Sequence, residues 1–338
     1  MGGVPDPSIA TSLPPEIADP GGVRARLYAR GITYGANYIG EVLGVVSGGR
    51  ERGTTYDGRL ELYTKWDLEK LIGWRGLTFY ANGYQLHGGS ITAEHIGSLA
   101  PASSIEATPA TRLFELWLEQ SLANGKISLR VGQLAADSEF VTSEGASAFV
   151  NATFGWPTIY AANMPDGGPA YPLAAPGARL KLELSDQATV LAAVFNGRPS
   201  RDCAIDDPQR CNPDGLLFPL GDPALFIAEG QFKYKLGLPG TLKLGGWTHS
   251  ASFDDTRFDD ARGLLAFTGG TPLVHGSNHG LYAIVDQKLY AVPGSDSRGV
   301  GVFGRLMTSP ADRNLVDLYV EGGVTFTGMW DRRPDDVL

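Results

Sequence analysis

The sequence predicts an all-β chain that forms an antiparallel up-and-down transmembrane β-barrel. About twelve segments of roughly 8–12 residues alternate polar and apolar side chains, and this is the length that a tilted strand needs to cross a bilayer. Short and long connections follow one another along the chain. No apolar run approaches the ~18–20 residues that a membrane-spanning helix needs. If the chain crosses a membrane, it therefore crosses it as strands.

Composition narrows the function classes. The chain has 338 residues, 19% of them charged, and a net charge of −9, which disfavours a broad nucleic-acid surface. Met1 is followed by Gly-Gly-Val-Pro-Asp-Pro, which has neither the basic nor the apolar region of a signal peptide. The chain is therefore either cytosolic or a mature form that carries an added Met. We expect residues 1–26 to form a strap or tail and residues 27–338 to form the barrel domain.

The expected strands follow in sequence and are separated by turn residues. They are 27–46, 59–67, 77–87, the two strands of a hairpin at 111–133, then 179–184, 188–196, 224–235, 241–249, 280–291, 298–307 and 315–327. Asn124-Gly125 separates the two strands of the hairpin and predicts a type I′ turn, because both central residues of that turn need φ > 0.

Short and long connections between these strands alternate along the chain. The long ones are 88–110, 136–178, 197–223 and 250–279, and the short ones include 68–76, 123–126, 185–188, 236–240 and 292–297. This sorting predicts a barrel with short turns on one rim and long loops on the other, which a soluble sandwich or propeller has no reason to show. Long irregular segments are usually functional, and we expect 136–178 rather than 88–110 to fold into the barrel.

The hairpin has one apolar and one polar face. Phe114, Leu116 and Leu118 share the apolar face with Ile127, Leu129 and Val131, which we expect to point outward. Glu115, Trp117, Glu119 and Arg130 share the opposite face, which we expect to line the lumen. Charged groups can hydrogen-bond sugar hydroxyls while an aromatic face packs against sugar C–H groups, so these four residues are candidates for sugar contact. The alternative is that the charges only neutralise one another in a wet lumen.

The sequence predicts a disulfide and no cofactor. Cys203 and Cys211 lie in a polar, turn-rich loop and have no zinc-like spacing, which favours a local disulfide over two free thiols. The acidic pairs 206–207, 254–255 and 259–260 could hold Ca²⁺ on the outer rim, although solvated acidic loops are the simpler interpretation.

Several separate blocks resemble one protein family. They are FELWLEQ at 114–120, LRVGQLAADSEF at 129–140, FGWPTIYAANMPDGGPAYPLAAPGARLKLE at 154–183, LGGWTHS at 244–250, GLYAIVDQKLY at 280–290 and PADRNLVDLYVEGGVTFTG at 310–328. Together they resemble the carbohydrate-selective porins (OprB type) of Gram-negative outer membranes. The resemblance implies a sixteen-stranded barrel that passes glucose and other neutral mono- or oligosaccharides by facilitated diffusion.

The resemblance also implies site residues and partners. Arg and Glu side chains with aromatic neighbours line the constriction of such porins, which points to Glu115, Trp117, Glu119 and Arg130 of this chain. Further candidates are Asp137, Glu139, Trp156 and Tyr160. Outer-membrane lipid is the implied partner, and a homo-oligomer is left open. Family members continue for about four more strands beyond a segment like the end of this chain, so we expect a C-terminal portion to be missing.

The sequence leaves three alternatives open. A general or anion-selective porin should have a constriction of one charge sign, and the polar face here is mixed. A soluble β-rich glycoside hydrolase would need paired carboxylates about 5–10 Å apart. Glu115 and Glu119 are four residues apart on one strand, about 13–14 Å between Cα atoms, so we predict that the chain is not an enzyme. The third alternative is a structural or adhesive barrel with a plugged lumen.

Overall fold

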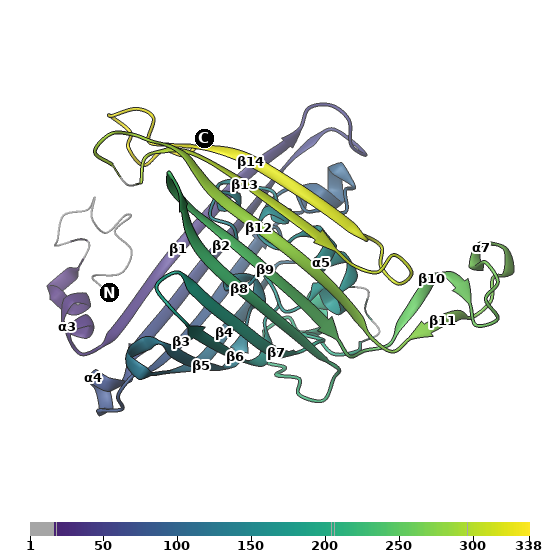
Figure 1. Cartoon of the computed structure of the whole chain (residues 1–338), viewed down its shortest axis with the longest axis horizontal. Helices are drawn as coiled ribbons and strands as arrows, with labels where there is room; N and C mark the ends of the chain where they lie inside the picture. Colours follow the sequence, from purple (N-terminus) through teal and green to yellow (C-terminus); the bar gives the residue numbers. More distant parts are fainter. Residues whose placement is uncertain (1–16, 18, 204, 206, 296) are drawn as a thin grey trace.

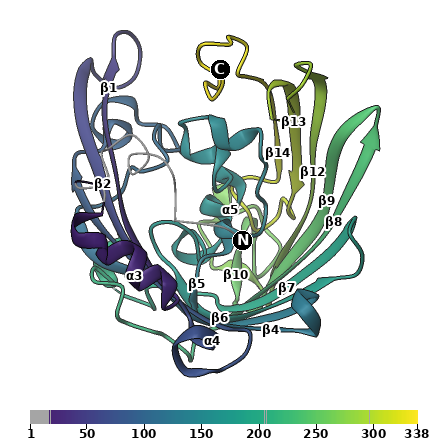
Figure 2. The ribbon, with the colours of Figure 1, turned by 90° about the vertical axis from the view of Figure 1, so that its left-hand side faces the viewer.

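The computed structural model describes residues 17, 19–203, 205, 207–295 and 297–338. Within them, twelve strands form one antiparallel sheet in the order β1-β2-β3-β4-β5-β6-β7-β8-β9-β12-β13-β14, with β1 and β14 at its edges (Figure 1). The sheet curves around a central space, as Figure 2 shows. The predicted all-β, up-and-down architecture is confirmed. In the described part of the chain, no helix combines the length and apolarity that a membrane span requires.

The strands of the large sheet have the following bounds: β1 Ile32–Val45, β2 Gly53–Asp67, β3 Leu77–Gly88, β4 Ala110–Leu122, β5 Ile127–Leu134, β6 Ala175–Glu183, β7 Ala188–Asn196, β8 Ala224–Leu236, β9 Leu238–His249, β12 Asn278–Ala291, β13 Gly299–Thr308 and β14 Leu318–Thr327. The helices are short: α3 Val23–Ala29, α4 Leu68–Ile72, α5 Thr158–Asn163, α6 Pro208–Cys211 and α7 Leu265–Thr268. Single helical turns are η1 Pro20–Gly22, η2 Thr92–Ile96, η3 Ala123–Gly125, η4 Ala136–Ser138, η5 Ala146–Ala148, η6 Ala152–Phe154 and η7 Pro165–Gly167.

The structure changes the expected start of the barrel. Helix α3 occupies part of the predicted first strand, which begins only at Ile32. The expected boundary at 26/27 falls inside this helix, and most of the predicted tail, residues 1–16 and 18, lies outside the described residues. Strand β2 begins at Gly53 rather than at 59, because the turn-like residues 53–58 pair fully with β1.

Two connections also differ from expectation. The last pair of the β4–β5 hairpin is Leu122–Ile127, so four residues form the turn rather than the two of a type I′ turn. Ala123 and Asn124 both have positive φ, 51° and 58°. The loop expected at 250–279 contains a separate hairpin, formed by β10 (Phe253–Asp259) and β11 (Pro272–His275), that projects from the sheet (Figure 1).

A β-bulge in β4 reverses the predicted direction of Phe114. Asn82 pairs with Glu115 and Gly83 with Leu113, so Phe114 is the extra residue. Phe114 is buried and packs on Tyr84, with ring centroids 4.9 Å apart, rather than facing outward. Beyond the bulge the expected alternation holds.

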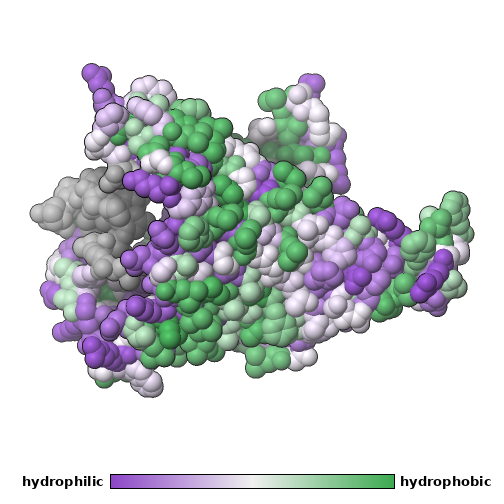
Figure 3. All heavy atoms as spheres, viewed as in Figure 1, coloured by the Kyte–Doolittle hydropathy of each residue, from purple (hydrophilic) through white to green (hydrophobic). Residues whose placement is uncertain are grey.

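The two faces of the sheet differ in polarity. Leu118, Leu129 and Val131 are about half exposed on the outer face, and apolar residues continue over the wall in Figure 3. The opposite face surrounds the connection 135–174, whose helix α5 lies inside the curve of the sheet (Figure 2). The inward loop is therefore the one expected from the sequence. Its Ile159 and Tyr160 are fully buried in a core with Trp247 and Tyr282 of the wall.

Candidate functional site

The inward loop is held by polar side chains of the wall that bind its backbone. Lys243 Nζ donates to the Thr142 carbonyl at 2.6 Å. Arg305 donates to the carbonyls of Val141 and Phe154, at 3.1 and 2.6 Å. Since these donors come from β9 and β13, residues 141–154 are fixed against the far side of the sheet.

Two carboxylates complete this attachment. Glu229 on β8 accepts hydrogen bonds from the Val141 N–H and from the Tyr282 hydroxyl, both at 2.9 Å. Asp286 on β12 accepts from the Ser143 hydroxyl and from the Gly145 N–H. The loop thus crosses the lumen as a fixed partition rather than as a free segment.

A four-residue charge cluster lies where the loop leaves the wall. It consists of Glu119, Arg130, Glu139 and Arg179, from β4, β5, the loop and β6. Arg130 lies 2.7 Å from Glu119 and 3.2 Å from Glu139. Arg179 lies 2.8 Å and 2.7 Å from the same two carboxylates. The charges of two guanidinium groups and two carboxylates cancel, so the cluster presents polar groups without a net charge. We call it the charge-balanced cluster.

The two arginines of this cluster differ in exposure. The Arg179 side chain is only 2% exposed and also donates to Ser128 Oγ at 2.6 Å. The side chains of Arg130, Glu119 and Glu139 are 15–23% exposed and face the lumen. Arg179 therefore fixes the carboxylates from behind, while Arg130 reaches the solvent side.

An aromatic pair adjoins the charge-balanced cluster. The Arg130 guanidinium lies 3.9 Å from the centroid of the Trp117 ring, a cation–π contact. Trp117 in turn stacks on Tyr80 of β3, with centroids 4.9 Å apart and planes 23° apart. Polar groups and aromatic faces thus lie side by side on three neighbouring strands.

Two of the predicted sugar-contact residues, Glu115 and Asp137, instead bind backbone N–H groups of the inward loop. Glu115 is 7% exposed and accepts a hydrogen bond from the Ala135 N–H at 3.2 Å. Asp137 accepts from the Tyr171 N–H at 3.0 Å. Burial raises the pKa of Asp137 to about 6, although the hydrogen bond from the Tyr171 N–H lowers it. These two carboxylates are engaged in holding the start of the loop.

The two aromatic candidates of the loop are packed as well. Trp156 donates its Nε1–H to the Gly167 carbonyl at 2.9 Å. The Tyr160 ring contacts Trp247 and Tyr282 edge-on, and its side chain is completely buried. In this structure both rings shape the loop, whereas Glu119, Arg130 and Glu139 of the charge-balanced cluster stay partly exposed beside the lumen.

Sequence reasoning missed Arg179, Glu229 and Arg305 as parts of the site. Each is a charged residue at an inward position of a strand whose outward positions are mostly apolar, and each is at most 2% exposed. That alternation is visible in the sequence. However, only the fold shows that the inward positions of β6, β8 and β13 meet the same loop.

The cysteine loop covers part of the long-loop rim. Cys203 and Cys211 form a disulfide, with Cα atoms 6.3 Å apart. Next to it, Asp207 and Gln209 accept hydrogen bonds from the hydroxyl and N–H of Thr108, at 2.7 and 2.8 Å. These contacts join the two loops that precede β4 and β8.

Comparison with known proteins identifies relatives of the chain. Residues 51–338 match the family model described as "Carbohydrate-selective porin, OprB family". The chain is 26% identical to Porin B of Pseudomonas aeruginosa over 95% of its own length and 71% of that protein. It is 22% identical to the putative porin QuiX of Acinetobacter baylyi, over 95% and 72% of the two lengths.

A solved structure shows the same fold. The high-pH structure of Pseudomonas putida OprB matches with a TM-score of 0.84 and 23% identity, covering 94% of this chain and 76% of that one.

Proposed function

Because the chain belongs to the OprB family of carbohydrate-selective porins, outer-membrane β-barrels of Gram-negative bacteria, we propose that neutral sugars diffuse through it past the charge-balanced cluster. The pore residues in this proposal are Glu119, Arg130 and Glu139, with Trp117 and Tyr80 as an aromatic platform. Glu115, Asp137, Trp156 and Tyr160 position the inward loop that narrows the pore, and any sugar contact by them would need the loop to move.

The observation that carries this proposal is charge cancellation beside an aromatic face. A field of one sign would concentrate ions of the opposite sign, whereas a cancelled field gives no such advantage. A sugar needs hydrogen-bond donors and acceptors for its hydroxyl groups and a flat apolar surface for its C–H groups. Arg130, Glu119 and Glu139 supply the polar groups. Trp117 is only 8% exposed between Arg130 and Tyr80, so the partly buried Tyr80 ring supplies the aromatic surface beside them.

The alternatives fit these contacts less well. An anion-selective porin would need an excess of positive charge, but each arginine here faces two carboxylates. A glycoside hydrolase needs one protonated carboxyl as general acid. Glu119 and Glu139 each contact both Arg130 and Arg179, so neither carboxyl is free to approach a glycosidic oxygen as that acid. Family membership likewise indicates a transport channel rather than an enzyme.

The partners follow from the same proposal. The exposed apolar outer face around Leu118 and Leu129 is suited to lipid acyl chains. Light scattering of the detergent-solubilised protein would decide whether the chain also forms the homo-oligomer that the sequence leaves open.

Liposome swelling with the purified protein tests the proposal. Glucose should enter faster than a neutral amino acid or a small anion of similar size, and Arg130→Ala or Trp117→Ala should slow glucose entry. Lys181→Ala is the matched control, because it removes a cation whose partner, Glu183, lies outside the cluster. Equal rates of entry for all three solutes would indicate a general porin without sugar selectivity. Unchanged glucose entry in both Arg130→Ala and Trp117→Ala would show that the filter lies elsewhere.

A further inference from the structure

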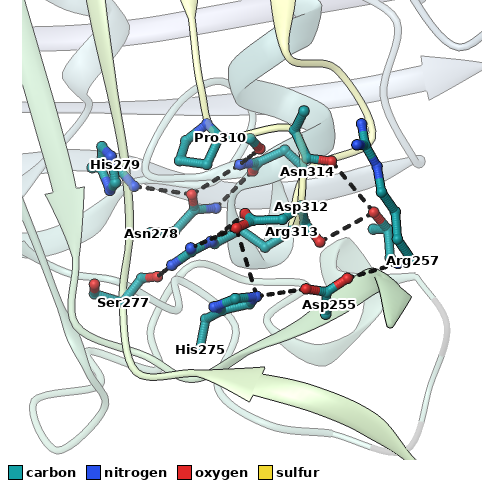
Figure 4. Close-up of polar contacts among 12 residues, drawn as sticks. Asp255, Arg257, His275, Ser277, Asn278, His279, Pro310, Asp312, Arg313 and Asn314 are labelled. Atoms are coloured by element: carbon teal, nitrogen blue, oxygen red, sulfur yellow. Dashed lines mark hydrogen bonds and ion pairs between the residues drawn. The ribbon is translucent and has the colours of Figure 1, made fainter. Parts of the chain in front are cut away.

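Three side chains of types that can bind metals converge at the base of the projecting hairpin (Figure 4). Asp255 comes from β10, His275 from β11, and Asp312 from the connection between β13 and β14. One ligand atom of each lies within 4.8 Å of the other two. They therefore join two loops that are separate in sequence, on the long-loop rim and away from the charge-balanced cluster.

The spacing of these atoms suits one small cation. His275 Nε2 lies 2.9 Å from Asp255 Oδ2 and 3.8 Å from Asp312 Oδ2. Two ligands of a tetrahedral zinc ion with bonds of about 2.0–2.2 Å are about 3.3–3.6 Å apart, which falls between these two distances. A hydrogen bond explains the shorter separation, but 3.8 Å is too long for one. A shared metal accounts for both carboxylates facing the same nitrogen.

The surroundings orient the ligands as a metal site requires. Asp255 Oδ1 accepts the N–H groups of Arg257 and Phe258, at 2.7 and 2.9 Å, which leaves Oδ2 directed at His275. Arg313 donates to both oxygens of Asp312 and to the Ser277 carbonyl. Carboxylates that bind metals are typically held by such outer partners.

Access and charge are also suitable. The Asp255 side chain is 3% exposed, whereas those of His275 and Asp312 are 18% and 40% exposed, so an ion can reach the site from solvent. Arg313 offsets one of the two carboxylate charges from its outer side, and the pair keeps a net negative charge toward the imidazole.

We propose that Asp255, His275 and Asp312 bind one zinc ion or a similar divalent transition metal, which fastens the β10–β11 hairpin to the β13–β14 connection. An imidazole ligand favours zinc, copper or nickel over Ca²⁺, which takes oxygen ligands. The sequence suggested Ca²⁺ at the acidic pairs. Of these, Asp206 lies outside the described residues, and only Asp255 belongs to the proposed site.

Calorimetric titration of ZnCl₂ into the full chain tests the proposal. The protein is tag-free, in detergent, and stripped beforehand with a chelator. We expect one site per chain, and His275→Ala and Asp312→Asn should each weaken binding at least about 10-fold, since even outer partners of metal ligands commonly change affinity by about 10–100-fold. CaCl₂ should give no comparable binding. His279→Ala is the matched control, because this neighbouring imidazole points away from the three ligands (Figure 4).

Trypsin cleavage at Arg262, near the hairpin tip, gives a second readout. Zinc should slow cleavage at this residue in the unmodified chain and in His279→Ala, and should leave the rate unchanged in His275→Ala. The proposal is wrong if the unmodified chain binds no zinc at a stoichiometry near one, or if both ligand variants bind it as tightly as the unmodified chain does.

Discussion

Replacing Arg179 with methionine would remove the buried cation behind the charge-balanced cluster and keep most of its volume. The cluster would change from two positive and two negative groups to one positive and two negative groups. The two carboxylates would keep Arg130 but would lose contacts of 2.8 and 2.7 Å. Two effects follow, one on stability and one on ion selectivity.

Breaking a buried ion pair by removing one partner typically costs about 3–5 kcal/mol. We expect the lower end, about 3 kcal/mol, because Glu119 and Glu139 stay paired with Arg130 and are partly exposed. For a permeating monovalent ion about 8 Å away, one uncompensated charge contributes about 0.5–2 kcal/mol between effective dielectric constants of 80 and 20. Because the charge attracts cations and repels anions equally, the two differ by about 1–4 kcal/mol, a roughly 5- to 900-fold preference for cations.

The reversal potential across a planar bilayer in a KCl gradient measures this preference. Arg179→Met should shift it toward cation selectivity. The double variant Arg179→Met/Glu139→Gln restores charge balance and should return it toward the original value, which a purely structural loss would not do. A folded single variant with an unchanged reversal potential would refute the view that charge cancellation sets selectivity.

Three further predictions concern the loops. Tyr160→Phe should change the free energy of unfolding by less than about 0.5 kcal/mol, because the buried hydroxyl has no hydrogen-bond partner among the described residues. Tyr160→Ala should cost about 3–5 kcal/mol, and unfolding in urea measures both. The pKa of Asp137 is raised in the folded loop, so ionisation of this carboxyl opposes folding. The contribution of Asp137 to the stability of the loop is therefore greatest below about pH 4 and is lost as the pH rises through about 6. Asp137→Asn should remove that decline, which hydrogen exchange of the loop would detect. Gly215→Ala should displace the cysteine loop, since its Cβ would lie 1.9 Å from the Leu113 carbonyl oxygen at φ +70°, and disulfide-loop proteolysis should rise.

For each of these three predictions, one outcome would contradict the reasoning. An equal loss of stability in both Tyr160 variants would mean that the hydroxyl has a role that the contacts do not show. A loop whose protection does not vary with pH in the unmodified chain would remove the argument from Asp137. Gly215→Ala with unaltered proteolysis would mean that the loop accommodates the methyl group.

The strands could be predicted from the sequence because each has one face toward lipid and the other toward the lumen, so apolar and polar residues alternate along it. The sequence was insufficient where local geometry breaks that alternation. The extra residue at Phe114 turns an apolar side chain inward, and nothing in FELWLEQ marks the bulge. Residues 53–58 have the composition of a turn, yet they form a strand because each of them pairs with a residue of β1.

The site shows the same division. Strand alternation placed Glu119 and Arg130 on one face, and the structure brings them within 2.7 Å of each other. It could not show that Arg179 lies behind them, because that contact depends on the register between β5 and β6. Nor could it show that Tyr160 is buried against Trp247, since the path of a long irregular loop follows from tertiary contacts alone.

The way the inward loop is fastened has a consequence for how such pores diversify. Lys243, Arg305 and Glu229 bind carbonyl and N–H groups of the loop, which every residue type except proline provides in full. The position of the partition is thus specified by the wall, while many of the side chains it presents to a passing solute are free to vary. Substitutions within the loop can therefore change the substrate preference while these hydrogen bonds to the loop backbone are retained.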